Sequence, residues 1–283
     1  MLDNIKKLKN NFVETTRNQR LDWIYLNKLL YENPKYKNTK RITHYDKCVF
    51  SQNGEDGIIN EIFKRIGTTN KFFVEFGVEN GLECNTTLLL LQDWKGLWIE
   101  ANESDYSEIK NIFKEPIEKN ILNVKNAFVS PDNIECIFNE FEIPKEPDLL
   151  SIDIDSVDYW VWKSITNYKP RVLIIEYNAM FFPPIVWIKK KNETQWDTDL
   201  NMGASLQALH DLNKLKGYTL VGCDFNGVNA FFVRDDCYND EIFESDTSAE
   251  FHYEISKPLY RYNFHKKAFS LGDKDKDIKK FEK

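Results

Sequence analysis

Carboxylate and amide side chains end two successive apolar runs in the second half of this sequence. Asp153 and Asp155 close the first run, and Glu176 and Asn178 close the second. Because side chains alternate along a strand, Asp153 and Asp155 would share one face of a sheet, and Glu176 and Asn178 would do the same. If the two runs are neighbouring strands, we expect their oxygen atoms to meet at one rim of the sheet.

Such a rim offers three kinds of role. Hard oxygen ligands suit Mg²⁺ or Ca²⁺, and Asp153, Glu176 and Asn178 are the candidate metal ligands. Without a metal, Asp153 or Asp155 would orient a hydroxyl group or take its proton. A structural rim is the third alternative, and the sequence leaves all three open. His210 is a further candidate base, although a lone histidine in a helix more often packs or lies at the surface.

A second group of carboxylates surrounds a pair of glycines in the first half of the chain. Residues 72–76 predict a buried strand, and Gly77 and Gly81 follow it in a turn that leads into an apolar stretch typical of a buried helix. A dinucleotide requires G-x-G-x-x-G spacing around its pyrophosphate, which this turn lacks. The carboxylates of the turn are those of Glu75, Glu79 and Glu83. They would repel phosphates and suit a ligand with a cationic amino group and a sulfonium, as in S-adenosylmethionine.

Glu100 ends the next predicted strand, residues 96–100. In nucleotide-binding sheets, an acidic side chain at this place accepts hydrogen bonds from a ribose diol. Together with the turn at Gly77, it predicts an adenosyl ligand at the C-terminal edge of a parallel sheet. The alternative is an ordinary buried strand and turn of an unrelated α/β domain.

The motif Glu75-x-Gly77-x-x-x-Gly81, with Glu100 after it, resembles the nucleotide-binding turn of Rossmann-like methyltransferases. Three further segments are similar to the FkbM-like group of these enzymes: 51–57, 203–206 and 227–233. In that group the first segment closes over the cofactor, whereas its polar residues and glycines also suit a simple helix cap, and both readings stay open. The resemblance covers roughly residues 50–234.

The resemblance implies a site for S-adenosylmethionine. It places the following residues beside the cofactor: Gln52, Glu75, Gly77, Gly81, Asn85, Glu100, Ala101, Asn126, Ala127 and Asp153. Glu100 would hold the ribose, Glu75 and the Gly77 turn would hold the methionine part, and residues 126–127 would lie near the adenine. The carboxylates after the fourth and fifth strands are also similar to those of macrocin-type O-methyltransferases, which use a metal ion. Here the sequence Glu-Tyr-Asn replaces the usual aspartate pair at the second strand.

The pattern of apolar residues predicts an α/β fold. Apolar runs alternate with segments of helical spacing from residue 50 onward, and the Asn-Gly pair at 226–227 predicts a terminal hairpin. We therefore expect a Rossmann-like methyltransferase sheet that is mostly parallel, with an antiparallel terminal hairpin and helices on both faces. The expected divisions are an N-terminal helical extension over 1–46, the domain over 47–236, and a C-terminal extension over 237–283 that packs on the domain and frays at its end.

Composition narrows the choice of partners. The net charge of −7 offers no basic field for nucleic acid. No run of about twenty apolar residues predicts a membrane span. The five scattered cysteines and the polar N-terminus predict reduced thiols in a cytoplasmic protein.

Our sequence-based hypothesis is an S-adenosylmethionine-dependent O-methyltransferase, with Mg²⁺ as a candidate metal. Its acceptor would be a hydroxyl or phospho-linked oxygen of a sugar or glycan precursor, in bacterial surface-polysaccharide (capsule) biosynthesis. We keep a homo-oligomer open. The alternatives are a nucleotide- or nucleotide-sugar-binding enzyme of the same fold and a non-catalytic interaction module.

Overall fold

The computed structural model describes residues 32–192 and 202–257. The chain forms two compact units, Met1–Thr39 with Lys257–Lys283, and Lys40–Ser256. The described part of the first unit contains a short 3-10 helix, η2 (Pro34–Tyr36). Most of the predicted N-terminal helical extension and the part of the predicted C-terminal extension beyond residue 257 lie outside the described residues. The divisions at 46 and 236 stay a prediction.

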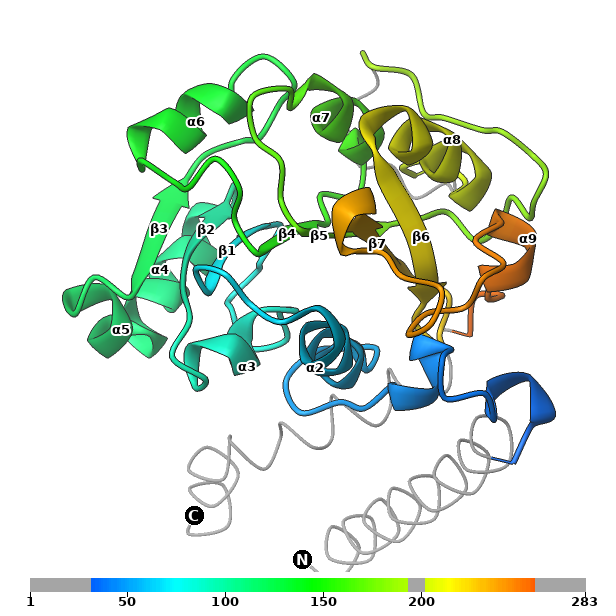
Figure 1. The fold of residues 1–283 in the computed structure, drawn as a ribbon. Helices are drawn as coiled ribbons and strands as arrows, with labels where there is room; N and C mark the ends of the chain where they lie inside the picture. Colours follow the sequence, from blue (N-terminus) through cyan, green and yellow to red (C-terminus); the bar gives the residue numbers. More distant parts are fainter. Residues whose placement is uncertain (1–31, 193–201, 258–283) are drawn as a thin grey trace, which may run out of the picture. The chain divides into compact units, whose positions relative to one another are not determined.

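The second unit is built around a seven-stranded sheet in the order β3-β2-β1-β4-β5-β7-β6 (Figure 1). Its strands are β1 (Phe72–Phe76), β2 (Lys95–Glu100), β3 (Leu122–Asn126), β4 (Leu149–Ile152), β5 (Val172–Glu176), β6 (Tyr218–Cys223) and β7 (Asn229–Arg234). The first five strands pair in parallel, and β7 runs antiparallel to both β5 and β6. The predicted mostly parallel sheet with an antiparallel terminal hairpin is confirmed.

Helices cover both faces of this sheet, as predicted. They are η3 (Ile42–Tyr45), α2 (Glu55–Ile66), α3 (Thr87–Leu90), α4 (Glu103–Ile112), α5 (Lys114–Glu118), α6 (Ile134–Glu140), α7 (Asp158–Ser164), α8 (Leu206–Lys216), η4 (Asp235–Cys237) and α9 (Ala249–His252). Buried side chains of α6, α7 and α8 pack on one face of the sheet, and those of α2, α3 and α4 pack on the other. None of the described helices is long and apolar enough to cross a membrane.

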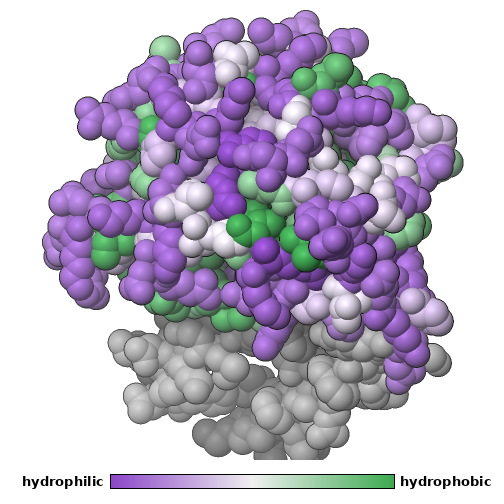
Figure 2. All heavy atoms as spheres, in the orientation of Figure 1, coloured by the Kyte–Doolittle hydropathy of each residue, from purple (hydrophilic) through white to green (hydrophobic). Residues whose placement is uncertain are grey.

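Apart from the edge strand β3, the strands are largely buried on both faces, which explains their apolar sequences. In β1, Val74 and Phe76 belong to the core beneath α6–α8, whereas Phe73 belongs to the core beneath α2–α4. The surface on the side seen in Figure 2 is mostly hydrophilic over the described residues, with hydrophobic side chains in small separate areas. The apolar content of the sequence is thus largely used to hold helices on the sheet.

Two details of the strand ends differ from the predictions. The glycine turn leads into a helix, α3, as predicted, but this helix is a single turn, and Leu91 after it is 72% exposed although the whole apolar run was expected to be buried. Strands β4 and β5 end at Ile152 and Glu176, so the alternation of side chains does not extend to Asp155 or Asn178. Two predictions are therefore wrong: Glu176 and Asn178 do not share one face of a strand, and neither do Asp153 and Asp155.

The strand order places a switch point between β1 and β4. From β1 the chain builds outward through β2 to β3, and it then returns to the other side of β1 to build β4 and β5. Ligands of open α/β sheets bind outside the C-terminal ends of the strands at such a point. Gly77 and Asp153, which follow β1 and β4 directly, lie at this point.

Candidate functional site

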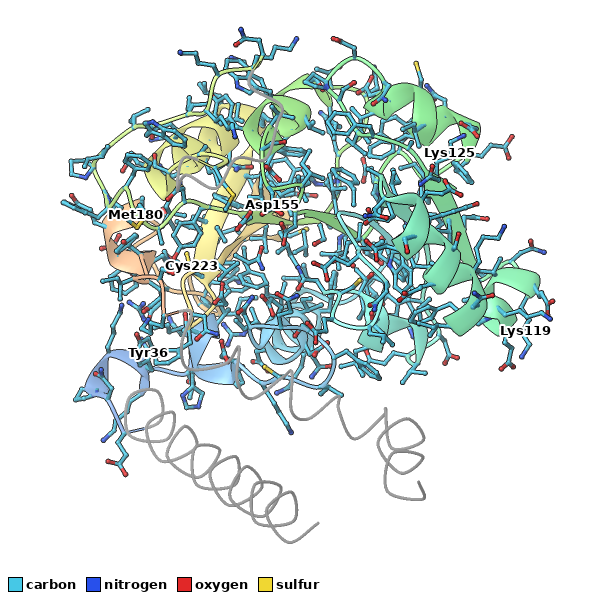
Figure 3. All side chains as sticks on the ribbon, turned by 180° about the vertical axis from the view of Figure 1, so that it is seen from behind. Tyr36, Lys119, Lys125, Asp155, Met180 and Cys223 are labelled. Atoms are coloured by element: carbon cyan, nitrogen blue, oxygen red, sulfur yellow. The ribbon has the colours of Figure 1, made fainter. Side chains whose placement is uncertain are left out.

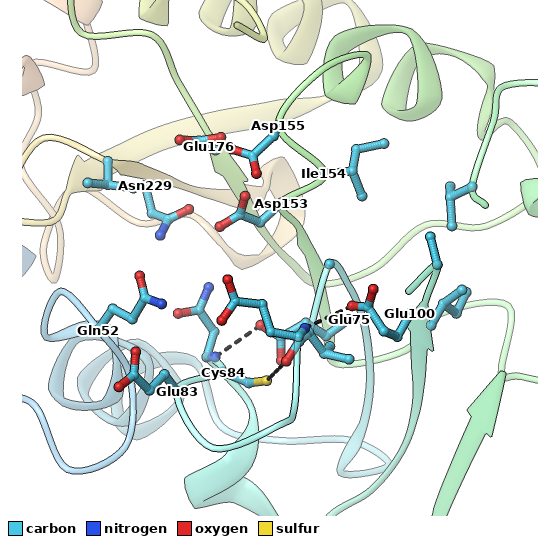
Figure 4. Close-up of a pocket in the computed structure, with 18 of the residues that line it drawn as sticks. Gln52, Glu75, Glu83, Cys84, Glu100, Asp153, Ile154, Asp155, Glu176 and Asn229 are labelled. Atoms are coloured by element: carbon cyan, nitrogen blue, oxygen red, sulfur yellow. Dashed lines mark hydrogen bonds between the residues drawn. The ribbon is translucent and has the colours of Figure 1, made fainter. Parts of the chain in front are cut away.

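A cavity of about 350 Å³ lies at the C-terminal ends of β1, β2, β4 and β5 (Figure 4). This volume is at the lower end of the range for small-molecule pockets, roughly 300–1,000 Å³. The predicted site residues that line it are Gln52, Glu75, Gly77, Asn85, Glu100, Ala101, Ala127, Asp153, Asp155 and Glu176. Both predicted groups of carboxylates, after β1 and β2 and after β4 and β5, therefore face one cavity.

Gly77 joins the two halves of the site. Its N–H donates to the carbonyl oxygen of Ile99 at 3.1 Å, and the N–H of Asp153 donates to that of Phe76 at 3.2 Å. The backbone of Gly77 has φ of +78°, and a Cβ built there would lie 1.4 Å from the carbonyl oxygen of Asp153. No side chain fits between the two strand ends, which explains why the turn requires glycine here.

Glu75 is buried at the end of β1, with 3% of its surface exposed. Its Oε1 accepts hydrogen bonds from Asn85 N at 3.0 Å and from Ser151 Oγ at 3.2 Å. Its Oε2 accepts from Thr86 N at 3.0 Å and from Thr86 Oγ1 at 2.6 Å. Burial raises the pKa of Glu75 to about 7, and these hydrogen bonds oppose the rise. Glu75 thus holds the chain before α3 against the sheet and titrates near neutral pH.

Glu100 organises the turn from the end of β2. Its Oε2 accepts from Glu79 N at 2.8 Å and its Oε1 from Asn102 N at 2.7 Å. Each carboxylate oxygen keeps acceptor capacity beyond these bonds, so Glu100 can still receive the hydroxyl groups of a diol. Asn126 does not line the cavity, because its Nδ2 donates to the carbonyl oxygens of Glu100 and Ala101 at 3.0 and 3.3 Å.

The segment before α2 is folded back by the first two residues of that helix. Oδ2 of Asp56 accepts hydrogen bonds from the backbone N–H groups of 49–51 at 2.7–2.8 Å. Glu55 Oε2 accepts from Asn53 N at 2.7 Å. Both Gln52 and Asn53 line the cavity. The segment is therefore held against the start of α2, and it also forms one wall of the site.

Three carboxylates converge at the ends of β4 and β5. One oxygen atom from each of Asp153, Asp155 and Glu176 lies within 4.8 Å of the other two (Figure 4). Burial raises the pKa of all three, and the neighbouring carboxylates raise those of Asp153 and Glu176 further. Lys189 opposes the rise at Asp155. The group therefore holds a proton more tightly than free carboxylates do, or can neutralise a bound cation.

Asp158, at the first position of α7, shapes the loop that carries Asp155. Its Oδ1 accepts from Ile154 N at 2.8 Å, and its Oδ2 accepts from Ser156 N at 3.1 Å. Burial raises the pKa of Asp158 to about 6. Asp155 has φ of +58°, so the loop turns sharply at this residue and brings its carboxylate back toward the strand ends.

The charged side chains that line the cavity are all acidic. Eight carboxylates face it: Glu55, Glu75, Glu79, Glu83, Glu100, Asp153, Asp155 and Glu176. No lysine, arginine or histidine is among the described residues of the lining. Figure 3 shows Lys119 and Lys125 at the β3 side of the sheet, whereas Asp155 lies near the middle. The cavity is thus built for a cationic or neutral ligand and disfavours phosphates.

Asn178, predicted as a metal ligand, does not line the cavity. Its Nδ2 donates to Met202 O at 3.0 Å, and its Oδ1 accepts from Met180 N at 3.0 Å. Because the chain leaves the sheet after Glu176, this amide holds the following loop instead of joining the carboxylates.

Gly81 and His210 also lie outside the cavity lining. A Cβ on Gly81 would come within 2.7 Å of the rings of Trp98 and Phe113, so this glycine permits close packing behind the turn. His210 lies on α8, where its Nδ1 is 3.2 Å from the carboxylate of Asp211.

Several lining residues were not predicted, among them Glu55, Phe128, Ile154 and Asn229. Phe128 is 57% exposed at the rim. Asn229 begins β7 and pairs in register with Glu176 of β5. The apolar stretch after β3 was a usable signal for Phe128, whereas the position of Asn229 depends on antiparallel pairing between strands distant in sequence.

Comparison with solved structures finds 304 matching chains. One is an S-adenosylmethionine-dependent methyltransferase from Clostridium acetobutylicum, at 12% identity and a TM-score of 0.39, over 76% of this chain and 98% of that one. Another is magnesium protoporphyrin IX methyltransferase from Synechocystis with bound S-adenosylmethionine, at 10% identity and a TM-score of 0.43, over 77% and 97%. No family model and no curated protein matches the sequence.

Proposed function

We propose that this protein is an S-adenosylmethionine-dependent methyltransferase. The observation that carries the proposal is the cavity at the β1/β4 switch point, which eight carboxylates line without any basic side chain among its described residues. S-adenosylmethionine carries a sulfonium and an ammonium group, so this acidic lining attracts it. The same lining counts against a dinucleotide or a nucleotide sugar, because both carry a pyrophosphate.

The cofactor would lie across the strand ends. Glu100 would accept hydrogen bonds from the ribose hydroxyls through its remaining acceptor capacity. Glu75 and the backbone of Gly77 would face the methionine part, close to the sulfonium. Ala127 and Phe128, which follow β3 and line the cavity, offer apolar surface for the adenine.

The reaction would be a direct displacement at the methyl carbon. The acceptor oxygen forms a bond to carbon while the carbon–sulfur bond breaks, and S-adenosylhomocysteine leaves with the bonding electrons. The proton of the acceptor passes to Asp153, Asp155 or Glu176. Correct positioning supplies up to about 7–11 kcal/mol of the barrier reduction, and a general base adds roughly a hundredfold to ten-thousandfold.

The same three carboxylates suit a divalent cation. Asp153, Asp155 and Glu176 present hard oxygen ligands within 4.8 Å of one another, which is the donor set that Mg²⁺ prefers. A bound Mg²⁺ would lower the pKa of an acceptor hydroxyl. In this proposal Asp155 takes the place that the sequence assigned to Asn178.

The acceptor would be a hydroxyl of a sugar or glycan precursor, in keeping with the FkbM-like segments. Surface-polysaccharide synthesis in the bacterial cytoplasm is the corresponding biological setting.

Titration calorimetry with S-adenosylhomocysteine tests the cofactor assignment. We expect micromolar binding to the wild type and no binding of NAD. Glu100→Gln removes the charge and one acceptor oxygen, and we expect it to weaken binding about tenfold, since a hydrogen bond to a charged group contributes about 1.5–3 kcal/mol.

The matched control is Glu118→Gln, which changes an exposed glutamate of α5 whose ion-pair partner is Lys114 at 3.7 Å. It should bind like the wild type. If the wild type did not bind S-adenosylhomocysteine, the proposed function would be wrong. If Glu100→Gln and the wild type bound it with equal affinity, only the assignment of Glu100 to the ribose would be wrong.

A further inference from the structure

Asn229 lines the cavity beside the end of β5. It is the first residue of β7 and stands opposite Glu176 of β5 in the antiparallel register. Residues paired in this way project to the same side of a sheet and lie close together. Asn229 is 2% exposed and lines the cavity together with Glu176.

A single hydrogen bond fixes the direction of the Asn229 amide. Its Nδ2 donates to Glu55 Oε1 at 2.8 Å. An ionised carboxylate only accepts, so the nitrogen of the amide must face Glu55 and the oxygen must face away from it. Figure 4 shows the amide oxygen of Asn229 on the side of Asp153.

The amide oxygen of Asn229, on the side of Asp153, has no hydrogen-bond partner among the described residues. Among the described residues, Oδ1 of Asn229 is buried and accepts no hydrogen bond. Leaving a buried acceptor unsatisfied costs about 1–3 kcal/mol, so such a group calls for an explanation. Asn226, on the same hairpin, also has a buried unpartnered Oδ1, but Asn226 does not line the cavity.

The charged side chains around this oxygen offer it no permanent donor. Glu55 receives the amide nitrogen of Asn229, and Asp153 and Glu176 are carboxyl groups. In the metal-free site, a phosphate or carboxylate placed here would add negative charge to a wall of acceptors. A hydroxyl or amino group would supply the missing hydrogen.

We propose that Asn229 binds the acceptor substrate through its Oδ1, and that the substrate therefore carries a second O–H or N–H donor beside the atom that is methylated. The substrate class is a neutral polyol or an amino alcohol, without a phosphate or carboxylate next to the reacting atom. This inference rests on the proposed function and narrows it, because it removes phospho-linked oxygens from the candidate acceptors.

The test measures methyl transfer to a matched panel of small acceptors, and the release of S-adenosylhomocysteine is the readout. The panel contains methyl glucoside, glucosamine, glucose 6-phosphate and glucuronate. We expect transfer to the neutral or cationic members, at least tenfold above the phosphate and the uronate. Faster or equal transfer to an anionic member would overturn the inference, as would binding of S-adenosylhomocysteine without transfer to any neutral or cationic member.

Three variants separate binding from folding. Asn229→Ala should lower kcat/KM for the best acceptor at least tenfold and leave the Kd of S-adenosylhomocysteine within twofold. Asn226→Ala, the matched control outside the lining, should keep kcat/KM per folded molecule. Glu55→Gln can donate as well as accept, so it no longer fixes the Asn229 amide, and we expect an intermediate loss.

An equal loss in the Asn226 and Asn229 variants would assign both residues a structural role and refute the inference. Failure of the wild type to bind S-adenosylhomocysteine would instead refute the proposed function. The two failures are therefore distinguishable.

Discussion

The two ends of strand β4 carry aspartates in opposite environments, Asp148 fully buried and Asp153 half-buried. Asp148, just before the strand, accepts hydrogen bonds from residues 69–71 and from Arg171 Nη1, the last at 2.9 Å. Burial alone would raise the pKa of Asp148, but the bonds from Arg171 and Thr69 lower it. Asp153, just after the strand, faces Asp155 and Glu176, and its pKa is raised well above the usual value.

Asp148 is placed so that it stabilises the fold, whereas Asp153 is placed where it can take part in chemistry. At the Asp148 end, the carboxylate meets Arg171 and several backbone N–H groups, and these bonds tie the start of β4 to the start of β5 and to the loop before β1. At the Asp153 end, like charges are held together without a basic side chain among the described lining residues. Such an arrangement costs free energy unless a proton or ligand relieves it, which is typical of functional sites.

The largest effect that we predict is loss of turnover at the Asp153 end. Asp153→Asn removes a candidate base and should lower kcat about a hundredfold to ten-thousandfold for the best acceptor. Because the raised pKa disfavours the charged form in the folded protein, the variant should unfold at an equal or higher urea concentration than wild type at pH 8. A variant that retained full turnover, or that unfolded much more easily, would erase the proposed difference between the two ends.

Asp148→Ala tests the other end. Removing one partner of a buried ion pair leaves Arg171 uncompensated and costs about 3–5 kcal/mol of unfolding free energy. Urea denaturation at pH 7 measures this loss, and affinity for S-adenosylhomocysteine should be unchanged in the fraction that remains folded. The double variant Asp148→Ala/Arg171→Met should recover part of the stability; no recovery would show that the ion pair is not the cause.

The smallest effect is a pH dependence of stability that originates in Glu75. Its pKa rises from 4.5 to about 7 in the folded protein, so the folded state binds more protons than the unfolded state between these values. Stability is therefore lost as the pH rises through this window, by up to about 3 kcal/mol from this group. Urea denaturation of the ligand-free protein at pH 5 and pH 8 should show the loss.

Glu75→Gln is the control for this dependence, because it removes the titrating group at similar size. The other buried carboxyls titrate in both proteins, so the difference in slope isolates Glu75. Parallel slopes would mean that the hydrogen bonds from Asn85, Thr86 and Ser151 already keep Glu75 charged, as Asp148 is kept charged by its own partners.

Much of the fold is predictable from the sequence. The apolar runs, the glycine turn and the Asn-Gly hairpin identify the strands, because each depends on neighbouring residues in the chain. The burial of the whole apolar run after Gly81 was predicted wrongly: the run at 88–91 lies in a helix of one turn, and Leu91 is exposed. Local hydrophobicity does not fix where a helix ends when the chain must return at once to β2.

The site was predictable where it follows a strand directly and less so elsewhere. Gly77, Glu100 and Asp153 come within one residue of a strand end, and all three line the cavity. Asn178 was assigned by assuming that β5 continues beyond Glu176. The amide next to Glu176 instead belongs to Asn229, and only the pairing of β5 with β7 brings it there.

The place of Asn229 on the last hairpin bears on how such a protein can be re-engineered. Residues that would hold the ribose and the methionine part of the cofactor lie in one contiguous stretch of the gene, codons 75–101, with an immovable glycine at 77. The proposed acceptor-binding wall is encoded between codons 153 and 229. It ends on a hairpin that contributes no residue to the glycine turn at the cofactor. Exchange of that hairpin between homologous genes would therefore give new acceptor preferences in a single recombination step, while the cofactor half is inherited intact.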